Sequence, residues 1–596
     1  MNQFFKFVFA SCLGTALALV LVSFIGFGVL ASIAGSAAKT EKVTVKSNSV
    51  LDLSFEQASI PEKTNNLDMD PFDVKQKDIL GLHDMVKAIQ TAKTDDNIKG
   101  IYINAMLVPA GKATSSVLRE ALIDFKQSGK FIVAYAPVYT QNAYYMASVA
   151  DSVLLNPVGS VDFRGLSSTI AYFKGLLEKT DIDLQIFYAG KFKSATEPFR
   201  LDKMSEENRL QVREYLTALN DIFMRDIAAS RNIPEDELRR VADAYEGRHA
   251  EGALKSRLVD RICYEDEAFG AMKKMIGLSD KDKLPLISVG DYFAAKGPKG
   301  DFKTKDKIAV VYAEGSIDVG KKGTPGTVVD GDYVGMLRKI RKDDKVKAIV
   351  LRVNSPGGSV LASENILREV QLCQEAGKPV VVSMGDVAAS GGYYIACQAD
   401  SIFAEPNTIT GSIGVFGMIP MLDRTMRQNL GVTFDTVRTG KHSAFGTPFI
   451  PFSPEEKDMI QQEIDRIYAD FLQKVAKGRD MTTEQVHEVA QGRVWPGTKA
   501  KELGLVDDLG GLDRALASAA KLANVEKYRV SEYPQTKKGL ERLLEELTGD
   551  DGKEDIIYDQ VARTELGDLY PLYRQVRDLQ RSQGIQARLP YELFIQ

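Results

Sequence analysis

The 596-residue sequence is poor in histidine, cysteine and tryptophan, with four, four and one of each. The histidines are scattered, which argues against a zinc site with helical or loop spacing and makes a histidine-based catalytic triad hard to assemble. The cysteines share no regular spacing, so neither a disulfide framework nor a CxxC metal clip is indicated. Acidic residues outnumber basic ones, 81 to 76. No basic face is therefore expected for phosphates, and nucleic acid is not an expected partner.

One long apolar run stands near the N-terminus. The stretch from Phe7 to Ala34 carries no charged residue, and it is longer than the roughly 20 residues that cross a bilayer core as a helix. A cleavable signal peptide has a shorter apolar core of about 7 to 15 residues. The run therefore predicts a tail and retained transmembrane anchor at residues 1–45. Lysines flank both ends, so they do not fix the orientation, and the short N-terminal tail favours export of the remaining chain.

The remaining chain contains one domain twice. Residues 131–152 match residues 380–401 at a constant offset of 249, and the match continues on both sides with small slips. A stretch rich in Gly, Pro and Lys separates the copies, as an exposed linker would. The predicted organisation is a first repeat at 46–293, a linker at 294–307, a second repeat at 308–527 and a helical C-terminal tail at 528–596.

Within each copy, short β-branched runs alternate with longer amphipathic stretches. In the second copy the runs at 347–353, 380–383 and 401–404 indicate strands, and residues 363–376 and 454–477 indicate helices. Alternation of this kind is typical of crossover units. It predicts an α/β fold with largely parallel sheets.

A glycine pair follows one of these predicted strands. Residues 354–358 read Asn-Ser-Pro-Gly-Gly, and Gly357 and Gly358 allow backbone N–H groups to approach a ligand closely. A plain strand-to-helix turn explains the motif equally well. The first copy lacks the paired glycines, which favours a functional role.

The second copy also holds a candidate nucleophile. Ser390 lies among alanines and glycines, which leave its hydroxyl reachable and leave the N–H of Gly391 available to an oxyanion. A helix N-cap or packing role is the plainer explanation of this segment taken alone. Its counterpart in the first copy is Gln141.

The first copy offers a base that the second lacks. Lys193 aligns with Ser443 of the second copy, and although a lone lysine is in general a surface charge, this complementarity indicates one composite site. A serine hydroxyl needs a base. Lysine serves at neutral pH only when burial lowers its pKa from about 10.4 by roughly 2 to 3 units, which predicts mildly alkaline activity. Ser412 is a candidate for orienting the amine, with a turn role as the alternative.

Several motifs in order along the chain resemble the long, duplicated signal peptide peptidase A (protease IV) family. They are GKFKSATEPF at 190–199, NSPGG at 354–358, ASGGYY at 389–394, TGSIGVFG at 410–417, QGRVWPG at 491–497 and GLVD at 504–507. The resemblance implies tandem Clp protease/crotonase-like domains and a serine endopeptidase with a Ser/Lys dyad that needs no metal or cofactor. It assigns Ser390 as nucleophile, Lys193 as base, Ser412 as the lysine-orienting residue, and Gly391, Gly358 and Gly357 to the oxyanion hole.

The resemblance also implies a setting for this activity. The expected substrates are cleaved signal peptides and other apolar peptides. The expected location is the cell inner membrane, with a single span and the catalytic bulk on the periplasmic side, and the expected assembly is a homotetramer. Two alternatives stay open. One is a noncatalytic membrane scaffold of crotonase-like repeats, and the other is an acyl-thioester enzyme.

Overall fold

The structure is a computed structural model that describes residues 43–55, 59–65, 79–298, 304–535 and 585–588. The predicted membrane anchor lies outside these residues. Among the described residues, no helix combines the length and apolar character needed to span a bilayer.

The first half of the chain, up to residue 298, builds a parallel sheet. In spatial order its strands are β6 (Arg261–Ile262), β4 (Ser152–Val161), β3 (Phe131–Tyr139), β2 (Ile98–Asn104), β1 (Ser49–Ser54) and β7 (Leu286–Ser288). All neighbouring strands run parallel. Successive side chains point to opposite faces, so Ile101 and Ile103 join one apolar core whereas Tyr102 joins another. Both faces are therefore buried, as expected for a parallel sheet.

The second half, from residue 304, repeats this arrangement. In spatial order its strands are β17 (Val494–Pro496), β15 (Ile409–Gly411), β13 (Val380–Ala389), β11 (Val346–Ser355), β8 (Lys307–Glu314) and β19 (Arg529–Tyr533), with β14 (Ser401–Ala404) paired to β13 and β18 (Asp508–Leu509) paired to β14. β17 runs antiparallel to β15, and the other pairs are parallel. The three strands predicted here all lie within observed strands. The prediction of an α/β fold with mostly parallel sheets is confirmed.

The predicted helical tail is wrong for two segments. β19 pairs with β8 just as β7 pairs with β1 in the first half, so the second copy continues past residue 527. β20 (Gln586–Arg588) pairs with β12 (Gly357–Ser359). A local pattern cannot reveal strands whose partners lie more than 200 residues earlier in the chain. The rest of the predicted tail, at 536–584 and 589–596, lies outside the described residues.

A third sheet joins the two halves. In spatial order its strands are β10 (Val328–Val329), β9 (Ile317–Asp318), β12, β20, β16 (Phe416–Met421) and β5 (Asp183–Tyr188). β5 belongs to the first half in sequence, yet all six of its residues pair antiparallel with β16 of the second half. β5 therefore leaves the first half, and the residues that follow it lie against the second half.

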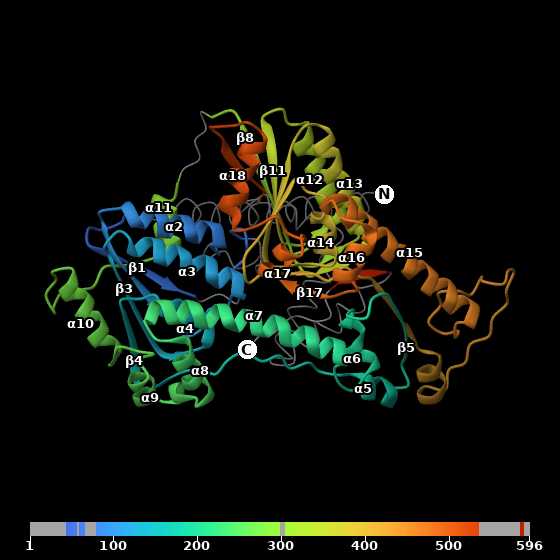
Figure 1. The fold of residues 1–596 in the computed structure, drawn as a ribbon, viewed down its shortest axis with the longest axis horizontal. Coiled ribbons are helices and arrows are strands. Elements are labelled where there is room, and N and C mark those ends of the chain that lie inside the picture. Colours follow the sequence, from blue (N-terminus) through green and yellow to red (C-terminus); the bar gives the residue numbers. More distant parts are fainter. Residues whose placement is uncertain (1–42, 56–58, 66–78, 299–303, 536–584, 589–596) are drawn as a thin grey trace, which may run out of the picture.

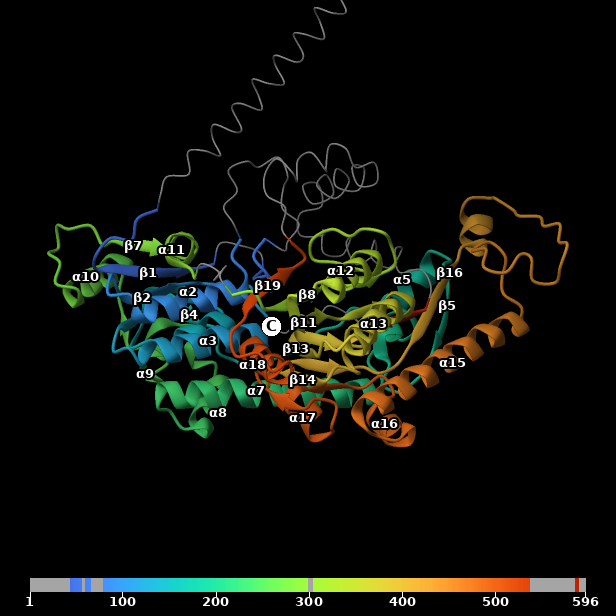
Figure 2. The ribbon, with the colours of Figure 1, turned by 90° about the horizontal axis from the view of Figure 1, so that it is seen from above.

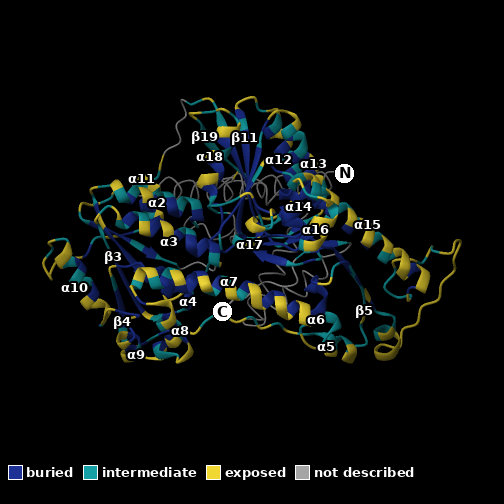
Figure 3. Cartoon of the chain, viewed as in Figure 1, coloured by how far each residue is buried: buried dark blue, intermediate teal, exposed yellow. Residues whose placement is uncertain are grey.

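Helices cover the sheets and link the halves. Those of the first half are α2 (Leu82–Thr94), α3 (Lys112–Lys126), α4 (Gln141–Ala147), α5 (Lys174–Lys179), α6 (Glu197–Arg200), α7 (Glu206–Arg231), α8 (Glu235–Asp243), α9 (Ala250–Lys255), α10 (Glu265–Met275) and α11 (Val289–Lys296). Those of the second half are α12 (Asp330–Lys342), α13 (Val360–Glu375), α14 (Gly391–Ala396), α15 (Pro454–Arg479), α16 (Thr483–Val489), α17 (Gly497–Glu502) and α18 (Leu512–Leu522). α7 runs from α6 back to the first half and so passes along both halves (Figure 1). Buried strands and exposed outer helix faces recur in each half (Figure 3).

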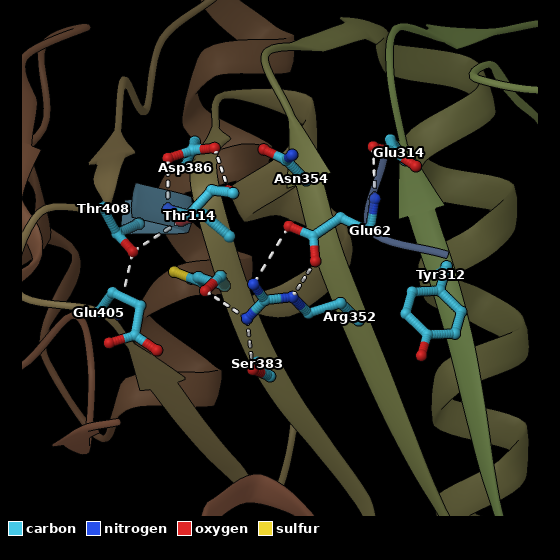
Figure 4. Close-up of polar contacts among 12 residues, drawn as sticks. Glu62, Thr114, Tyr312, Glu314, Arg352, Asn354, Ser383, Asp386, Glu405 and Thr408 are labelled. Atoms are coloured by element: carbon cyan, nitrogen blue, oxygen red, sulfur yellow. Dashed lines mark hydrogen bonds and ion pairs between the residues drawn. The ribbon is translucent and has the colours of Figure 1, made fainter. Parts of the chain in front are cut away.

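A buried ion pair joins the two halves. Arg352 of β11 contacts both carboxylate oxygens of Glu62, at 2.9 and 3.1 Å, and also donates to Ser383 of β13 at 2.8 Å (Figure 4). Both charged side chains are almost fully buried. A buried charge is tolerated only when it is paired and hydrogen-bonded, so this contact fixes one relative placement of the halves.

Candidate active site

Ser390 occupies a strained turn between β13 and α14. Its φ of 54° and ψ of −112° are unusual for any residue with a side chain. The conformation is held by two backbone hydrogen bonds, from the Ser390 N–H to the Gly411 carbonyl and from the Tyr394 N–H to the Ser390 carbonyl, both 2.8 Å. A sharp strand-to-helix turn of this kind presents a nucleophilic hydroxyl at the end of a sheet.

The glycines around Ser390 are required by close backbone approach. A Cβ on Gly392 would lie 2.7 Å from the carbonyl oxygen of Ser355, and a Cβ on Gly391 would lie 2.8 Å from the hydroxyl of Ser363 and 3.0 Å from the backbone nitrogen of Gly358. The residue types predicted for an oxyanion hole therefore lie next to one another. Gly391 follows the candidate nucleophile, and Gly358 belongs to β12 beside it.

Lys193 of the first half lies at this turn because it follows β5, which pairs with β16 of the second half. Its Nζ lies 2.8 Å from the Ser390 Oγ, 3.1 Å from the Ser412 Oγ and 3.3 Å from the Ser412 carbonyl oxygen. The lysine is 1% exposed and both serines are 0% exposed. Burial lowers the pKa of Lys193 to about 7, because the charged ammonium loses its solvation. A large share of the amine is therefore neutral at physiological pH.

Two acceptors on Ser412 orient this amine. A neutral amine has two N–H groups and one lone pair. When the N–H groups donate to the carbonyl and hydroxyl oxygens of Ser412, the lone pair faces the proton of Ser390. Ser412 itself has a φ of 51°, and its N–H donates to the Arg493 carbonyl at 2.7 Å. The backbone thus holds Ser412 in place and fixes its carbonyl acceptor.

Replacing Ser412 by alanine is expected to lower kcat about 100-fold with little change in KM, because the amine loses one of its two orienting acceptors and misplacement by about 1 Å costs that much. Steady-state kinetics on a fluorogenic peptide would measure the effect. Ser443→Ala, which removes a hydroxyl from an exposed residue, is the matched control. An unchanged kcat in Ser412→Ala would show that the hydroxyl does not position the lysine.

The loop at residues 491–493, part of the QGRVWPG motif, holds the segment that carries Lys193. No role is predicted for this loop from the sequence. The Phe192 N–H donates to the Gln491 carbonyl at 2.9 Å. Gly492 has a φ of +79°, and a Cβ there would lie only 2.6 Å from the Cβ of Lys193. The Arg493 guanidinium lies over the ring of Phe192, 4.7 Å from its centroid. A Gly-Arg pair recurs in both copies, at 247–248 and 492–493, and this recurrence is the sequence signal that could have identified the loop.

β13, the strand that leads to Ser390, also contacts the first half. Asp386, near the end of β13, accepts hydrogen bonds from the N–H and the hydroxyl of Thr114, at 3.0 and 2.6 Å (Figure 4). Thr114 belongs to the first turn of α3, where N–H groups have no partner within the helix. The carboxylate therefore accepts from the first turn of a helix in one half while it belongs to the strand that leads to Ser390 in the other.

Comparison with protein families gives two matches. The sequence model described as peptidase family S49 matches residues 124–279 and 373–526, just over half of the chain in two separate segments. The model described as Clp protease matches residues 300–410. Lys193 falls in the first S49 segment, and Ser390 and Ser412 fall in the second.

Curated relatives agree with these matches over most of the chain. Protease 4 of Salmonella typhi is 39% identical over 477 residues, which cover 78% of this chain and 76% of the relative. Protease 4 of Haemophilus influenzae is 38% identical over 74% of this chain and 73% of its own length. The chloroplastic serine protease SPPA of Arabidopsis thaliana is 32% identical over 75% of this chain and 66% of its own length.

Proposed function

The chain belongs to peptidase family S49 and is a serine peptidase, and we propose that it cleaves peptides internally through a dyad of Ser390 and Lys193. One observation carries the proposal. A fully buried lysine amine lies 2.8 Å from a fully buried serine hydroxyl on a strained turn. Neither burial nor strain of this kind is expected for a surface lysine and an ordinary cap.

The first chemical step follows from the contacts of the two residues. Neutral Lys193 takes the proton of Ser390 as the serine oxygen attacks the peptide carbonyl. The carbonyl oxygen becomes an oxyanion, which the N–H groups of Gly391 and Gly358 stabilise. Gly357 allows the peptide to approach closely, because a side chain there would meet the Gly391 nitrogen at 2.6 Å. Protonated Lys193 then donates its proton to the leaving amine.

The second step regenerates the enzyme. The C–N bond breaks, and the acyl group remains on the Ser390 oxygen as an ester. Lys193, neutral again, accepts a proton from water as the water oxygen attacks the ester. The acid product leaves, and the proton returns to Ser390. One water molecule is consumed, and apart from it and the peptide substrate the two steps balance with the groups of Ser390 and Lys193.

A fluorophosphonate probe tests the dyad directly. We expect stoichiometric labelling of Ser390 above pH 7, located by mass spectrometry of the tryptic peptide, because the probe reacts with activated serine hydroxyls. Labelling should be lost in Lys193→Met and retained in Lys191→Met, which changes an exposed lysine two residues away. Labelling of another serine, or equal labelling in both variants, would contradict the assignment.

The setting proposed for this activity is a membrane surface on the exported side of the cell inner membrane. The charge-free stretch from Phe7 to Ala34 supports an anchor. Peptides released into a membrane, such as cleaved signal peptides, are apolar and extended, and a buried site bordered by strands suits them. These features favour a peptidase over the scaffold and over the acyl-thioester enzyme.

The repeat itself supports self-assembly, for which we propose a homotetramer. β5 of the first half pairs with β16 of the second, and the offset of 249 places the counterpart of β5 at 432–437 and that of β16 at 167–172. Neither counterpart lies in a strand of the described chain. Residues 422–453 project beyond the rest of the molecule (Figures 1 and 2) and carry exposed Val432, Phe434 and Val437. Pairing with residues 167–172 of a second copy would repeat the internal contact and close a ring.

A further inference from the structure

The strand position between β12 and β16, close to Ser390, is occupied by the chain's own strand β20. This strand lies between β12 and β16 and runs antiparallel to both. Gln586 is 4% exposed and Ala587 is 0% exposed. β20 is therefore buried in the site rather than laid on the surface, although the chain reaches it more than 50 residues after β19 ends.

The pairing register directs one carbonyl group of β20 at the proposed oxyanion hole. The Val360 N–H donates to the Ile585 carbonyl at 3.3 Å. Hydrogen-bonded positions recur at every second residue of an antiparallel ladder, and the next pair along is Gly358 with Ala587. The Ala587 carbonyl is thus aimed at the Gly358 N–H.

The glycine geometry gives the same position independently. A Cβ on Gly391 would lie 3.0 Å from both the Ala587 carbonyl oxygen and the Gly358 nitrogen, and a Cβ on Gly357 would lie 2.2 Å from that oxygen. The Ala587 carbonyl therefore lies where the two candidate oxyanion-hole residues meet. A substrate carbonyl would have to occupy this same place.

Because Ser390 is buried, the position of β20 determines whether a peptide can reach it. A peptidase must let its nucleophile contact a peptide, yet Ser390 is 0% exposed. An extended peptide binds such a site by adding a strand to a sheet, with main-chain hydrogen bonds on its edges. The strand position between β12 and β16 is already taken. A peptide from solution can enter only when β20 leaves.

We propose that β20 is an intramolecular occupant of the substrate strand, with Ala587 in the place of the residue that precedes the scissile bond. The proposal deepens the proposed function and rests on it for the identity of the groove. Molecules with β20 in place do not bind peptide, so the apparent Kd of a peptide exceeds its intrinsic value by the inverse of the open fraction. Displacing β20 should therefore tighten peptide binding without altering the dyad.

A binding measurement in the Ser390→Ala background tests this without relying on catalysis. The probe is a fluorescein-labelled peptide with the sequence of residues 583–590, and its affinity is read by fluorescence anisotropy. Adding Ala587→Trp places a side chain too large for a fully buried alanine position, so β20 should leave the groove. We expect the peptide to bind at least tenfold more tightly than to Ser390→Ala alone. Gln586→Pro, which removes an N–H from the strand, should give the same gain.

The matched control is Ala294→Trp, which adds the same side chain at an exposed residue of α11 and should leave the affinity unchanged. Equal or weaker peptide binding in both β20 variants, with thermal unfolding like that of the parent, would overturn the proposal. Failure of the dyad would instead appear as absent fluorophosphonate labelling of the chain with Ser390 intact. The two failures are therefore distinguishable.

Discussion

Replacing Ser390 by alanine is expected to abolish peptide hydrolysis, with kcat lowered by about 10⁴-fold or more, because removal of a nucleophile that acts together with its base costs this much in serine peptidases. Assembly and folding should be unaffected, since the substitution removes one oxygen from a turn whose backbone hydrogen bonds are made by other atoms. Hydrolysis of a casein-like protein or of a synthetic signal peptide, followed by mass spectrometry, would measure the loss.

The matched control for this variant is Ser443→Ala, which removes the hydroxyl of an exposed serine at the repeat position of Lys193. Its activity should equal that of the parent chain. A Lys193→Met chain purified in the same way should be inactive, which would exclude contaminating peptidases. Turnover retained in Ser390→Ala under these conditions would show that Ser390 is not the nucleophile.

Replacing Lys193 by methionine is expected to cause a loss of similar size and to remove the pH dependence of catalysis. The base must be neutral, and burial lowers the pKa of Lys193 to about 7. In the parent chain, kcat/KM should fall tenfold per pH unit below about pH 7 and level off above it, because kcat/KM reports the pKa of the free enzyme. A pH–rate profile measures this. A flat profile between pH 5 and pH 9 would contradict the assignment of Lys193 as the base.

The same substitution should stabilise the fold. The pKa of Lys193 is lower in the folded chain than the ordinary 10.5, so the unfolded chain binds more protons between about pH 7 and pH 10.5 and stability rises with pH across that window. At pH 7 and below, burying the group costs up to about 5 kcal/mol. Thermal unfolding of Lys193→Met should therefore occur at a higher Tm than that of the parent at pH 7, and the gap should narrow towards pH 10. Lys191→Met should shift neither profile.

The sequence was informative wherever the signal was local or repeated. Runs of β-branched residues marked β11, β13 and β14, since a strand buried on both faces is apolar along its length. The comparison of the two copies singled out Ser390 and Lys193, because each copy lacks what the other has, and the structure places the two side chains in contact.

The rest depended on contacts between distant segments. No pattern in residues 183–188 indicates that β5 leaves its own sheet to pair with β16, and none in residues 586–588 indicates a strand beside Gly358. The support of Asp386 by Thr114 joins residues 272 positions apart. Such pairings are set by the docking of two folded cores rather than by local propensity, so a single sequence read along its length does not contain them.

The proposed base and nucleophile come from different halves of the chain, so their contact should be easier to lose than the tertiary structure of either half. Each sheet has its own apolar core, whereas Lys193 and Ser390 are brought together by contacts between the halves. These contacts include β5, the Glu62–Arg352 pair, the Thr114–Asp386 hydrogen bond and the apolar cluster in which α7 meets β15 and β17. Sub-global opening requires less free energy than complete unfolding. Mild denaturant is therefore expected to abolish the proposed activity reversibly, by separating the two halves before either one unfolds.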